Sequence, residues 1–424
     1  MSSQLDYKAL PIFGLAVVWL WLEHWRMDLG IAWEDSYHHW LLAAHIARTG
    51  LSLDPITGNS NGWLPLYHWM GAGVLSLFGW HNLEALGWFS AFLTLLTAAL
   101  IAWKRGNVWA AVFLFNPVTV LNGSLSVVEP LAALLAVAGV ILWEAEVAWG
   151  AALCWALVAL CDRGSWPEVA VAVLWFLPKP IALFPVLGLS IGYGLTHQEV
   201  GTTAVWAAVD QRGLGTISER LANLLHFSWK PLVIALILAG LGFWKRPDLR
   251  SATLVCAGLA AVFVFVSAGN LTGSSRYYLL PIALLAFLSG GGRPWVGWLL
   301  LPCLGFFSFQ YLELWPQWVI LNRPSVQAGM WLRDKTGTLA TDSPVVAYIS
   351  GWLPEKIQGT AKIDRADFIA TIVDPRYQKL YPLLVQYPKI LAGKPLPGWR
   401  VGLDAEDWTI KYGAKPIRIY EKMR

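Results

Sequence analysis

Charged side chains are scarce in this chain. Only 14% of its 424 residues are Asp, Glu, Lys or Arg, against about 25% in an ordinary soluble protein. The net charge is only +4, which gives no reason to expect nucleic-acid binding. The cysteines lie inside apolar stretches without a close metal-ligand pair, so no disulfide framework is predicted. They are Cys154, Cys161, Cys256 and Cys303.

Two familiar sequence signals are also missing. The chain has no P-loop and no G-x-G-x-x-G after a predicted strand, so nothing indicates a nucleotide-binding domain. The first apolar segment lacks an A-x-A cleavage site and is followed by Glu23, His24 and Trp25. We therefore interpret this segment as an uncleaved transmembrane helix rather than a signal peptide.

Apolar residues are abundant instead. They make up 56% of the chain, and the mean hydropathy is +0.51. Many of the 27 tryptophans stand at the ends of apolar segments, as expected of indoles at the headgroup level. The sequence therefore predicts a polytopic α-helical membrane protein. The candidate segments are 9–25, 63–79, 84–103, 108–121, 131–143, 148–161, 167–178, 181–195, 230–244, 251–269, 276–290 and 295–311.

Basic clusters indicate which segments cross the membrane. Positive residues favour the cytoplasmic side, and the compact clusters are at 104–105, 245–250 and Arg293. All three lie inside if the N-terminus is inside and the short segment 63–79 lies at the interface. This choice leaves about eleven transmembrane helices and one long external loop, 26–83, which contains interfacial helices.

This topology divides the chain into two predicted domains. Residues 1–321 form the transmembrane domain, with external loops 26–83, 122–130 and 196–229. Residues 322–424 have ordinary charge density, which predicts a small external α/β domain. Its expected elements are a helix closing near Trp331–Arg333 and strand-like pieces at 344–349, 368–373 and 418–420.

Ionisable residues gather at the start of the first loop. Glu34 and Asp35 are followed by His38 and His39, and six of the eight histidines lie between His24 and His81. Ionisable groups at a membrane edge are costly unless they function. The same topology brings Glu129 to this face. A purely structural alternative is that Asp35 caps the helix that follows it.

The order of these motifs resembles the GT-C superfamily of membrane glycosyltransferases. The resembling stretches are Glu34-Asp35-Ser36-Tyr37-His38, 44–50, 62–67, Asn116-Pro117 to Glu129-Pro130, and Ser275-Arg276-Tyr277. The similarity is to members that use a polyprenyl-phosphate sugar, of the ArnT and protein mannosyltransferase types. It implies a GT-C fold, a lipid-linked donor and, in the usual family pattern, inversion at the anomeric carbon.

The resemblance and the residue chemistry together assign candidate roles. Asp35 is the first choice for the base that deprotonates the acceptor, and Glu34 is the second. Glu129 supports the same catalytic centre. The metal candidates are Asp35 and His39, for Mg²⁺ or Mn²⁺. The residues expected to bind substrate or phosphate are Arg276, Lys230, His38, Tyr37, Arg163 and Asn61.

The predicted activity is transfer of a monosaccharide, a hexose such as mannose, to an acceptor hydroxyl. The acceptor is a glycan, a lipid or a protein. The enzyme is expected in a prokaryotic plasma membrane, among its lipids, with the active site and C-terminal domain on the outer face. One alternative is a transporter or flippase, which would place ionisable residues at the bilayer midplane. The other is a non-catalytic subunit of a membrane assembly.

Overall fold

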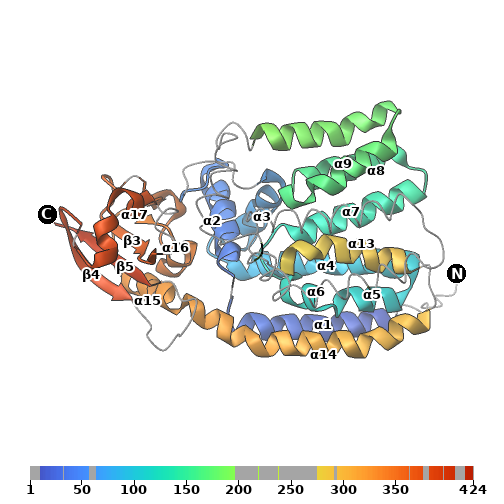
Figure 1. Ribbon diagram of the computed structural model, residues 1–424, viewed down its shortest axis with the longest axis horizontal. Helices are drawn as coiled ribbons and strands as arrows, with labels where there is room; N and C mark the ends of the chain where they lie inside the picture. The colour runs from blue at the N-terminus through green and yellow to red at the C-terminus, as the bar shows by residue number, and fades with distance from the viewer. Residues whose placement is uncertain are drawn as a thin grey trace.

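The computed structural model describes nine stretches of the chain, together with Ser218 and Ile237. The stretches are 10–31, 33–56, 64–195, 275–290, 294–361, 363–375, 382–394, 396–405 and 416–423. They form a bundle of helices with a small sheet at one end, and helix α2 (Glu34–Thr49) lies between the two parts (Figure 1).

The bundle is built from helices of unequal length. Its members are α1 (Leu10–Asp28), α4 (Leu83–Arg105), α5 (Asn107–Leu114), α6 (Pro117–Asn122), α7 (Glu129–Glu144), α8 (Ala148–Ala159), α9 (Trp166–Phe176), the helical stretch Pro180–Leu195, α13 (Leu279–Ser289) and α14 (Pro294–Val319). Within the described residues, Leu83–Arg105 and Pro294–Leu332 are long and apolar enough to cross a membrane. The remaining apolar helices are shorter, and the predicted segments 230–244 and 251–269 lie outside the described residues. The number of spans therefore stays a prediction.

The segment predicted at 108–121 is two helices rather than one. The Asn116 side chain accepts a hydrogen bond from the backbone N–H of Val118, and Pro117 has no N–H to continue α5. The chain therefore restarts as the short helix α6 before it reaches the second loop.

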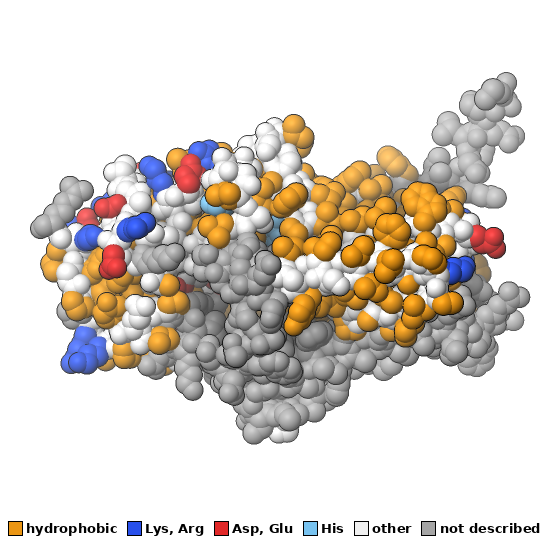
Figure 2. Space-filling view, turned by 90° about the horizontal axis from the view of Figure 1, so that it is seen from above, with side chains coloured by type: hydrophobic (Ala, Val, Ile, Leu, Met, Phe, Trp, Pro, Cys, Tyr) orange, Lys and Arg blue, Asp and Glu red, His pale blue; other side chains and the backbone are white. Residues whose placement is uncertain are grey.

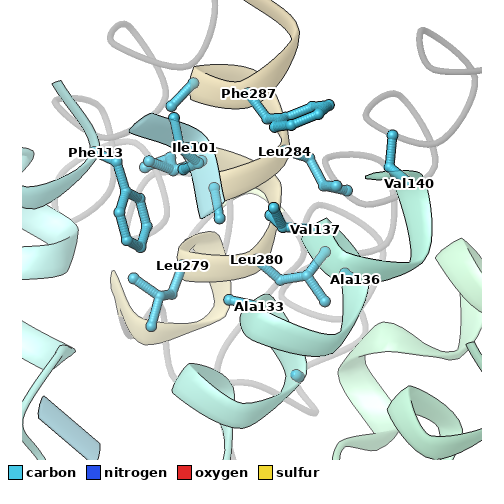
Figure 3. Close-up of a cluster of buried hydrophobic side chains, with 14 of the residues drawn as sticks. Ile101, Phe113, Ala133, Ala136, Val137, Val140, Leu279, Leu280, Leu284 and Phe287 are labelled. Carbon is cyan, nitrogen blue, oxygen red and sulfur yellow. The ribbon is translucent and has the colours of Figure 1, made fainter. Parts of the chain in front are cut away.

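Small residues bring α7 and α13 together. Ala133, Ala136 and Val137 of α7 pack beside Leu280 and Leu284 of α13, and all are buried (Figure 3). Small side chains let neighbouring helices approach closely, which is how helices gain packing energy in a bilayer.

Arg105 and Arg276 lie at opposite ends of the bundle. At one end Arg105 forms an ion pair with Glu144, and its Nε donates to the backbone carbonyl of Phe287 at 3.1 Å. These residues end α4, α7 and α13. Glu129 is the first residue of α7, and Arg276 lies in the turn just before α13. Both residues are at the opposite end of the bundle. The basic cluster at 104–105 and the acidic loops are therefore separated by the length of the bundle, as the topology predicts.

One face of the bundle is largely apolar. Figure 2 shows hydrophobic side chains over the helices, with charged side chains gathered on the C-terminal part and a few at the far end. The exposed members include Trp69, Phe78, Trp103, Trp149 and Leu187. A surface this apolar is expected to face lipid.

The C-terminal part contains a five-stranded sheet of order β2-β1-β3-β5-β4. The strands are β1 (Leu339–Thr341), β2 (Ile357–Gln358), β3 (Phe368–Ile372), β4 (Trp399–Ala405) and β5 (Ile417–Lys422). Strand β1 is parallel to β2 and β3, and β5 is antiparallel to β3 and β4. The predicted strands at 368–373 and 418–420 are confirmed. Helix α15 (Arg323–Leu332) ends where the sequence predicted, and α17 (Pro382–Gln386) is a short addition.

The strand predicted at 344–349 is wrong. These residues form helix α16 (Pro344–Ser350). Ser343 caps the helix by accepting from the backbone N–H of Val346, and Pro344 occupies the first turn, where its missing N–H costs nothing. The valines that suggested a strand are buried, so packing overrides their preference for extended structure.

Helix α2 is shared by the bundle and the C-terminal part. Trp40 and Leu41 lie in one apolar cluster with Ala328 of α15 and Val345 of α16. The Trp40 ring meets Tyr348 edge-on, with 4.8 Å between centroids. Helix α3 (Pro65–Phe78) packs beside α2, in the segment predicted to lie at the interface. The first loop is therefore held on both sides.

Candidate active site

Arg276 joins the two loops that carry the predicted carboxylates. Its Nη1 lies 2.8 Å from Oδ2 of Asp35, and its Nε lies 3.2 Å from Oε1 of Glu129. The side chains of Arg276 and Glu129 are 10% and 4% exposed, whereas that of Asp35 is 45% exposed. One guanidinium thus holds an open carboxylate and a buried one.

Local structure explains why these groups converge. Helix α2 begins at Glu34 after Trp33, and no side chain caps it, so Asp35 is not the cap. Asp35 instead uses its carboxylate to bind Arg276. Glu129 opens α7 next to Pro130, and Arg276 stands in the single turn η3 (Ser275–Tyr278) that leads into α13.

Tyr277 occupies the third side of the guanidinium. Arg276 Nη2 donates to the Tyr277 hydroxyl at 2.8 Å, and the guanidinium carbon lies 4.8 Å from the tyrosine ring centroid. The three guanidinium nitrogens therefore face three different oxygens.

His38 is oriented by Asp54, a residue of the same loop. Its Nε2 lies 2.8 Å from Oδ2 of Asp54, which is 1% exposed. Oδ1 of Asp54 accepts from the backbone N–H of Ile56 at 2.9 Å, which fixes the carboxylate. Burial opposes a charge on the imidazole, but Asp54, with Asp35 and Glu34, raises the pKa of His38 above its usual value.

His39 pairs with His68 of α3. His39 Nδ1 lies 2.7 Å from His68 Nε2, and His68 Nδ1 lies 2.9 Å from the carbonyl of Leu64. Burial lowers the pKa of His68 to about 4 and that of His39 well below its usual value. Both imidazoles are therefore neutral at pH 7.

Asp35 and His39, the predicted metal ligands, do not belong to a cluster of three possible ligands among the described residues. Across the described residues, no three His, Cys, Asp or Glu side chains converge to hold a metal ion. Asp35 binds Arg276 and His39 binds His68. Arg276 is therefore the cation that the described residues supply beside Asp35, and the metal assignment of Asp35 and His39 stays a prediction.

The remaining candidates are placed unevenly. Glu34 is half-buried at the start of α2, and Tyr37 is buried against Tyr348 with 5.4 Å between ring centroids. Lys230 and Asn61 lie outside the described residues. The backbone of Arg163 lies in the turn η1 (Arg163–Ser165), and its side chain is outside the described part.

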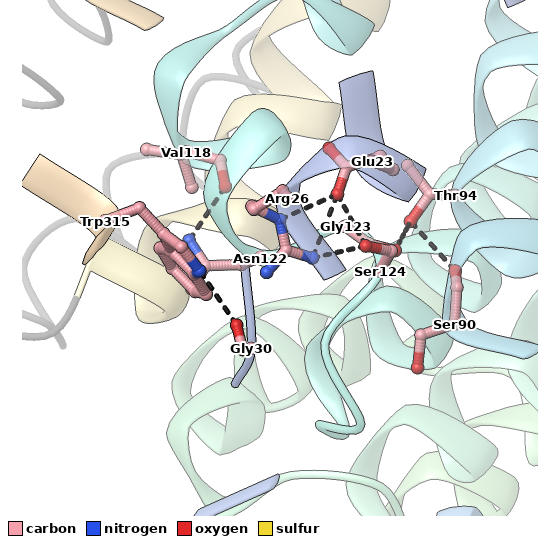
Figure 4. A network of polar contacts seen from close by, with 10 residues as sticks. All are labelled: Glu23, Arg26, Gly30, Ser90, Thr94, Val118, Asn122, Gly123, Ser124 and Trp315. Atoms are coloured by element: carbon pink, nitrogen blue, oxygen red, sulfur yellow. Dashed lines mark hydrogen bonds and ion pairs between the residues drawn. The ribbon is translucent and has the colours of Figure 1, made fainter. Parts of the chain in front are cut away.

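A buried polar network connects the starts of both loops (Figure 4). Arg26 Nε donates to Glu23 at 3.0 Å, and the Ser124 hydroxyl of the second loop contacts both side chains. The Arg26 guanidinium lies 4.6 Å from the ring centroid of Trp315, whose Nε1 donates to the Gly30 carbonyl at 2.9 Å. The network thus fixes the chain just before Asp35 and just before Glu129.

We expect Trp315→Phe to weaken this connection. Phenylalanine keeps a ring beside Arg26 but loses the hydrogen bond to Gly30, which should destabilise the protein by about 1–2 kcal/mol. Thermal unfolding of the purified protein measures the change. Trp318→Phe is the matched control, because the Trp318 indole donates no hydrogen bond to a described residue. Equal melting temperatures for the two variants would contradict the assigned role.

Asp342 of the C-terminal part is close enough to Glu34 of the first loop for the two charges to interact. Asp342 follows β1, is 7% exposed, and accepts hydrogen bonds from the hydroxyls of Thr360 and Thr371. Burial raises the pKa of Asp342 from 3.8 to about 6, with a further increase from the carboxylate of Glu34. The C-terminal part and the acidic loop are therefore electrostatically linked.

Replacement of Asp342 by asparagine should change how stability depends on pH. A folded-state pKa above the unfolded value means that the stabilising contribution is complete below about pH 4 and lost as pH rises through about 6. The free energy of unfolding of the wild type should therefore fall relative to that of Asp342→Asn between about pH 4 and 7, by at most about 3 kcal/mol. Thermal unfolding across this range checks it, and a constant difference would count against it.

Sequence reasoning missed several of these residues. Asp54 stands in an Asp-Pro turn and looked like an ordinary loop residue. Tyr277 is adjacent to Arg276, but nothing in the pattern showed that its hydroxyl would meet the guanidinium. Glu23 and Arg26 are spaced three apart on one helix, the spacing of a facing ion pair, and this signal could have been used.

Two crystal structures of ArnT, a GT-C glycosyltransferase from Cupriavidus metallidurans, are similar to this chain. The structure bound to undecaprenyl phosphate has 12% identity and a TM-score of 0.55, and the apo structure has 12% identity and a TM-score of 0.52. Each match covers 96% of this chain and 97% of the ArnT chain. Neither a protein-family model nor a curated protein sequence matches. At this identity the likeness shows the fold alone, and the chain therefore has the GT-C fold that the ArnT structures have.

Proposed function

We propose that this protein is a membrane glycosyltransferase that takes a monosaccharide from a polyprenyl-phosphate donor. The observation that carries the proposal is the convergence of Asp35, Glu129 and Arg276 at the end of the bundle nearest the C-terminal sheet. A carboxylate for the acceptor proton and a cation for the leaving phosphate are the groups that such a transfer requires.

The reaction follows from these positions. Asp35, the more exposed carboxylate, takes the proton from an acceptor hydroxyl. The acceptor oxygen then bonds to the anomeric carbon, and the bond from that carbon to the phosphate oxygen breaks. The polyprenyl phosphate leaves with the electron pair. Arg276 stabilises its negative charge, since a guanidinium binds phosphate oxygens through paired hydrogen bonds.

Glu129 has a second task in this scheme. Its Oε1 faces Arg276, while its Oε2 is buried and makes no hydrogen bond to a described residue. A buried carboxylate oxygen is costly without a donor. Glu129 is therefore suited to accept a hydrogen bond from a hydroxyl of the donor sugar.

The fold supports a lipid-linked donor. ArnT shares the fold over nearly its full length, and one of its structures contains undecaprenyl phosphate. The apolar face would hold a prenyl chain beside the bundle. The proposed site faces the non-cytoplasmic side, because the basic cluster at 104–105 lies at the opposite end. We also propose a prokaryotic plasma membrane, a hexose such as mannose, and inversion at the anomeric carbon. The acceptor would be a glycan, a lipid or a protein.

A transfer assay tests the proposal. The purified full-length protein is incubated in lipid nanodiscs with undecaprenyl-phosphate-linked hexoses and candidate acceptors. Release of undecaprenyl phosphate together with a new glycosidic bond is the expected result. Movement of the intact lipid-linked sugar across a membrane, without bond cleavage, would indicate a flippase and overturn the proposal.

A further inference from the structure

Each of the three guanidinium nitrogens of Arg276 faces an oxygen of a described residue. Asp35 lies at Nη1, Glu129 at Nε and Tyr277 at Nη2. The guanidinium has five N–H groups, and a phosphate that binds a neighbouring pair of them comes beside at least one of these oxygens. Repulsion between the phosphate and a neighbouring carboxylate favours displacement of that carboxylate when the donor binds.

The three partners differ in how easily they can move. Glu129 is 4% exposed and fixed at the start of α7, and Tyr277 is the neighbour of Arg276 in the chain. The side chain of Asp35 is 45% exposed, and it stands in the first turn of α2. An exposed carboxylate that leaves an ion pair is solvated by water, whereas a buried one loses the opposite charge that offsets the cost of its burial.

We propose that the donor phosphate exchanges with Asp35 at Nη1 of Arg276, so that donor binding releases the base. Glu129 and Tyr277 are positioning residues that hold the guanidinium during the exchange. The proposal rests on the proposed function for the identity of the lipid donor. It adds an order of events: Asp35 is engaged by Arg276 until the donor arrives, and only then accepts the proton of the acceptor.

Charge repulsion and geometry account for the exchange. In the donor-free arrangement one guanidinium faces two carboxylates. The phosphodiester of the donor carries one negative charge, as a carboxylate does, and its two non-bridging oxygens can accept paired guanidinium hydrogen bonds, so it can take the place of the exposed Asp35 at Nη1. The released Asp35 stays on α2, one turn from His38, whose raised pKa favours a cation there.

Affinity for undecaprenyl phosphate measures the competition. Asp35→Asn removes the competing carboxylate and should bind this lipid about fivefold more tightly than the wild type. Glu34→Gln is the matched control, because it removes a charge from the neighbouring residue of α2 and should change affinity less than about twofold. Glu355→Gln, which breaks the distant surface pair with Arg48, should leave affinity unchanged.

Each outcome decides the proposal. Equal tightening in Asp35→Asn and Glu34→Gln would show a general charge effect, and weaker binding by Asp35→Asn would show that Asp35 assists the phosphate. Either result overturns the exchange. The proposed function fails separately, if the wild type transfers no sugar from any lipid-linked donor.

A structure of the wild type with undecaprenyl phosphate gives a second readout. The expected map has a phosphate oxygen at Nη1 of Arg276, with Asp35 displaced and Glu129 and Tyr277 in place. A map in which Asp35 keeps Nη1 while the phosphate lies elsewhere would refute the exchange.

Discussion

Asp35→Asn should reduce kcat for glycosyl transfer by about a thousandfold. Asparagine has nearly the same shape and still accepts a hydrogen bond, but it cannot take a proton at neutral pH. General-base catalysis contributes about 10²–10⁴ to a rate, so a loss within that range identifies the base. Single-turnover transfer from a lipid-linked sugar, at saturating donor, measures the chemical step without product release.

The neighbouring carboxylate provides the control for this loss. Glu34 and Asp35 are adjacent, and the sequence alone left the choice between them open. The structure places Oδ2 of Asp35 2.8 Å from Nη1 of Arg276, which favours Asp35 as the base. Glu34→Gln should therefore reduce kcat by no more than about tenfold. A thousandfold loss in Glu34→Gln with an active Asp35→Asn would exchange the two roles.

Much of the fold could be predicted because membrane helices follow simple rules. Apolar length and the position of basic residues correctly placed α4, α7, α8 and α13, and grouped Arg105 at the end away from the acidic loops. Local sequence was less informative in the C-terminal part. Residues 344–350 are helical because of a cap at Ser343 and burial on both sides, which a pattern of valines does not reveal.

The site was predictable only in part, for a physical reason. Acidic residues at helix starts are visible in the sequence, and topology brought Glu129 to the same end as Asp35. The residue that joins them is a matter of three-dimensional contact: Arg276 is over 140 residues away from Glu129 in the chain. Asp54 and Tyr277 act through an imidazole and a guanidinium, so their importance depends on contacts that spacing does not encode.

Arg276→Gln should have the second large effect, on stability as well as on activity. It leaves Glu129 buried without its cation, and breaking a buried ion pair in this way costs about 3–5 kcal/mol. Transfer should fall by about a thousandfold or more, because the leaving phosphate also loses its cation. Melting temperature and single-turnover transfer, measured on the same preparation, record both changes.

Two further variants separate folding from chemistry at this position. Arg276→Gln combined with Glu129→Gln removes the unpaired charge, so the double variant should regain much of the melting temperature without regaining activity. Arg276→Lys keeps the positive charge but has a single nitrogen, which cannot face Asp35, Glu129 and Tyr277 at once. We expect it to retain an intermediate rate, about 10–100-fold below the wild type. If the stabilised double variant transferred sugar at the wild-type rate, Arg276 would be a structural link between the loops and not the group that receives the phosphate.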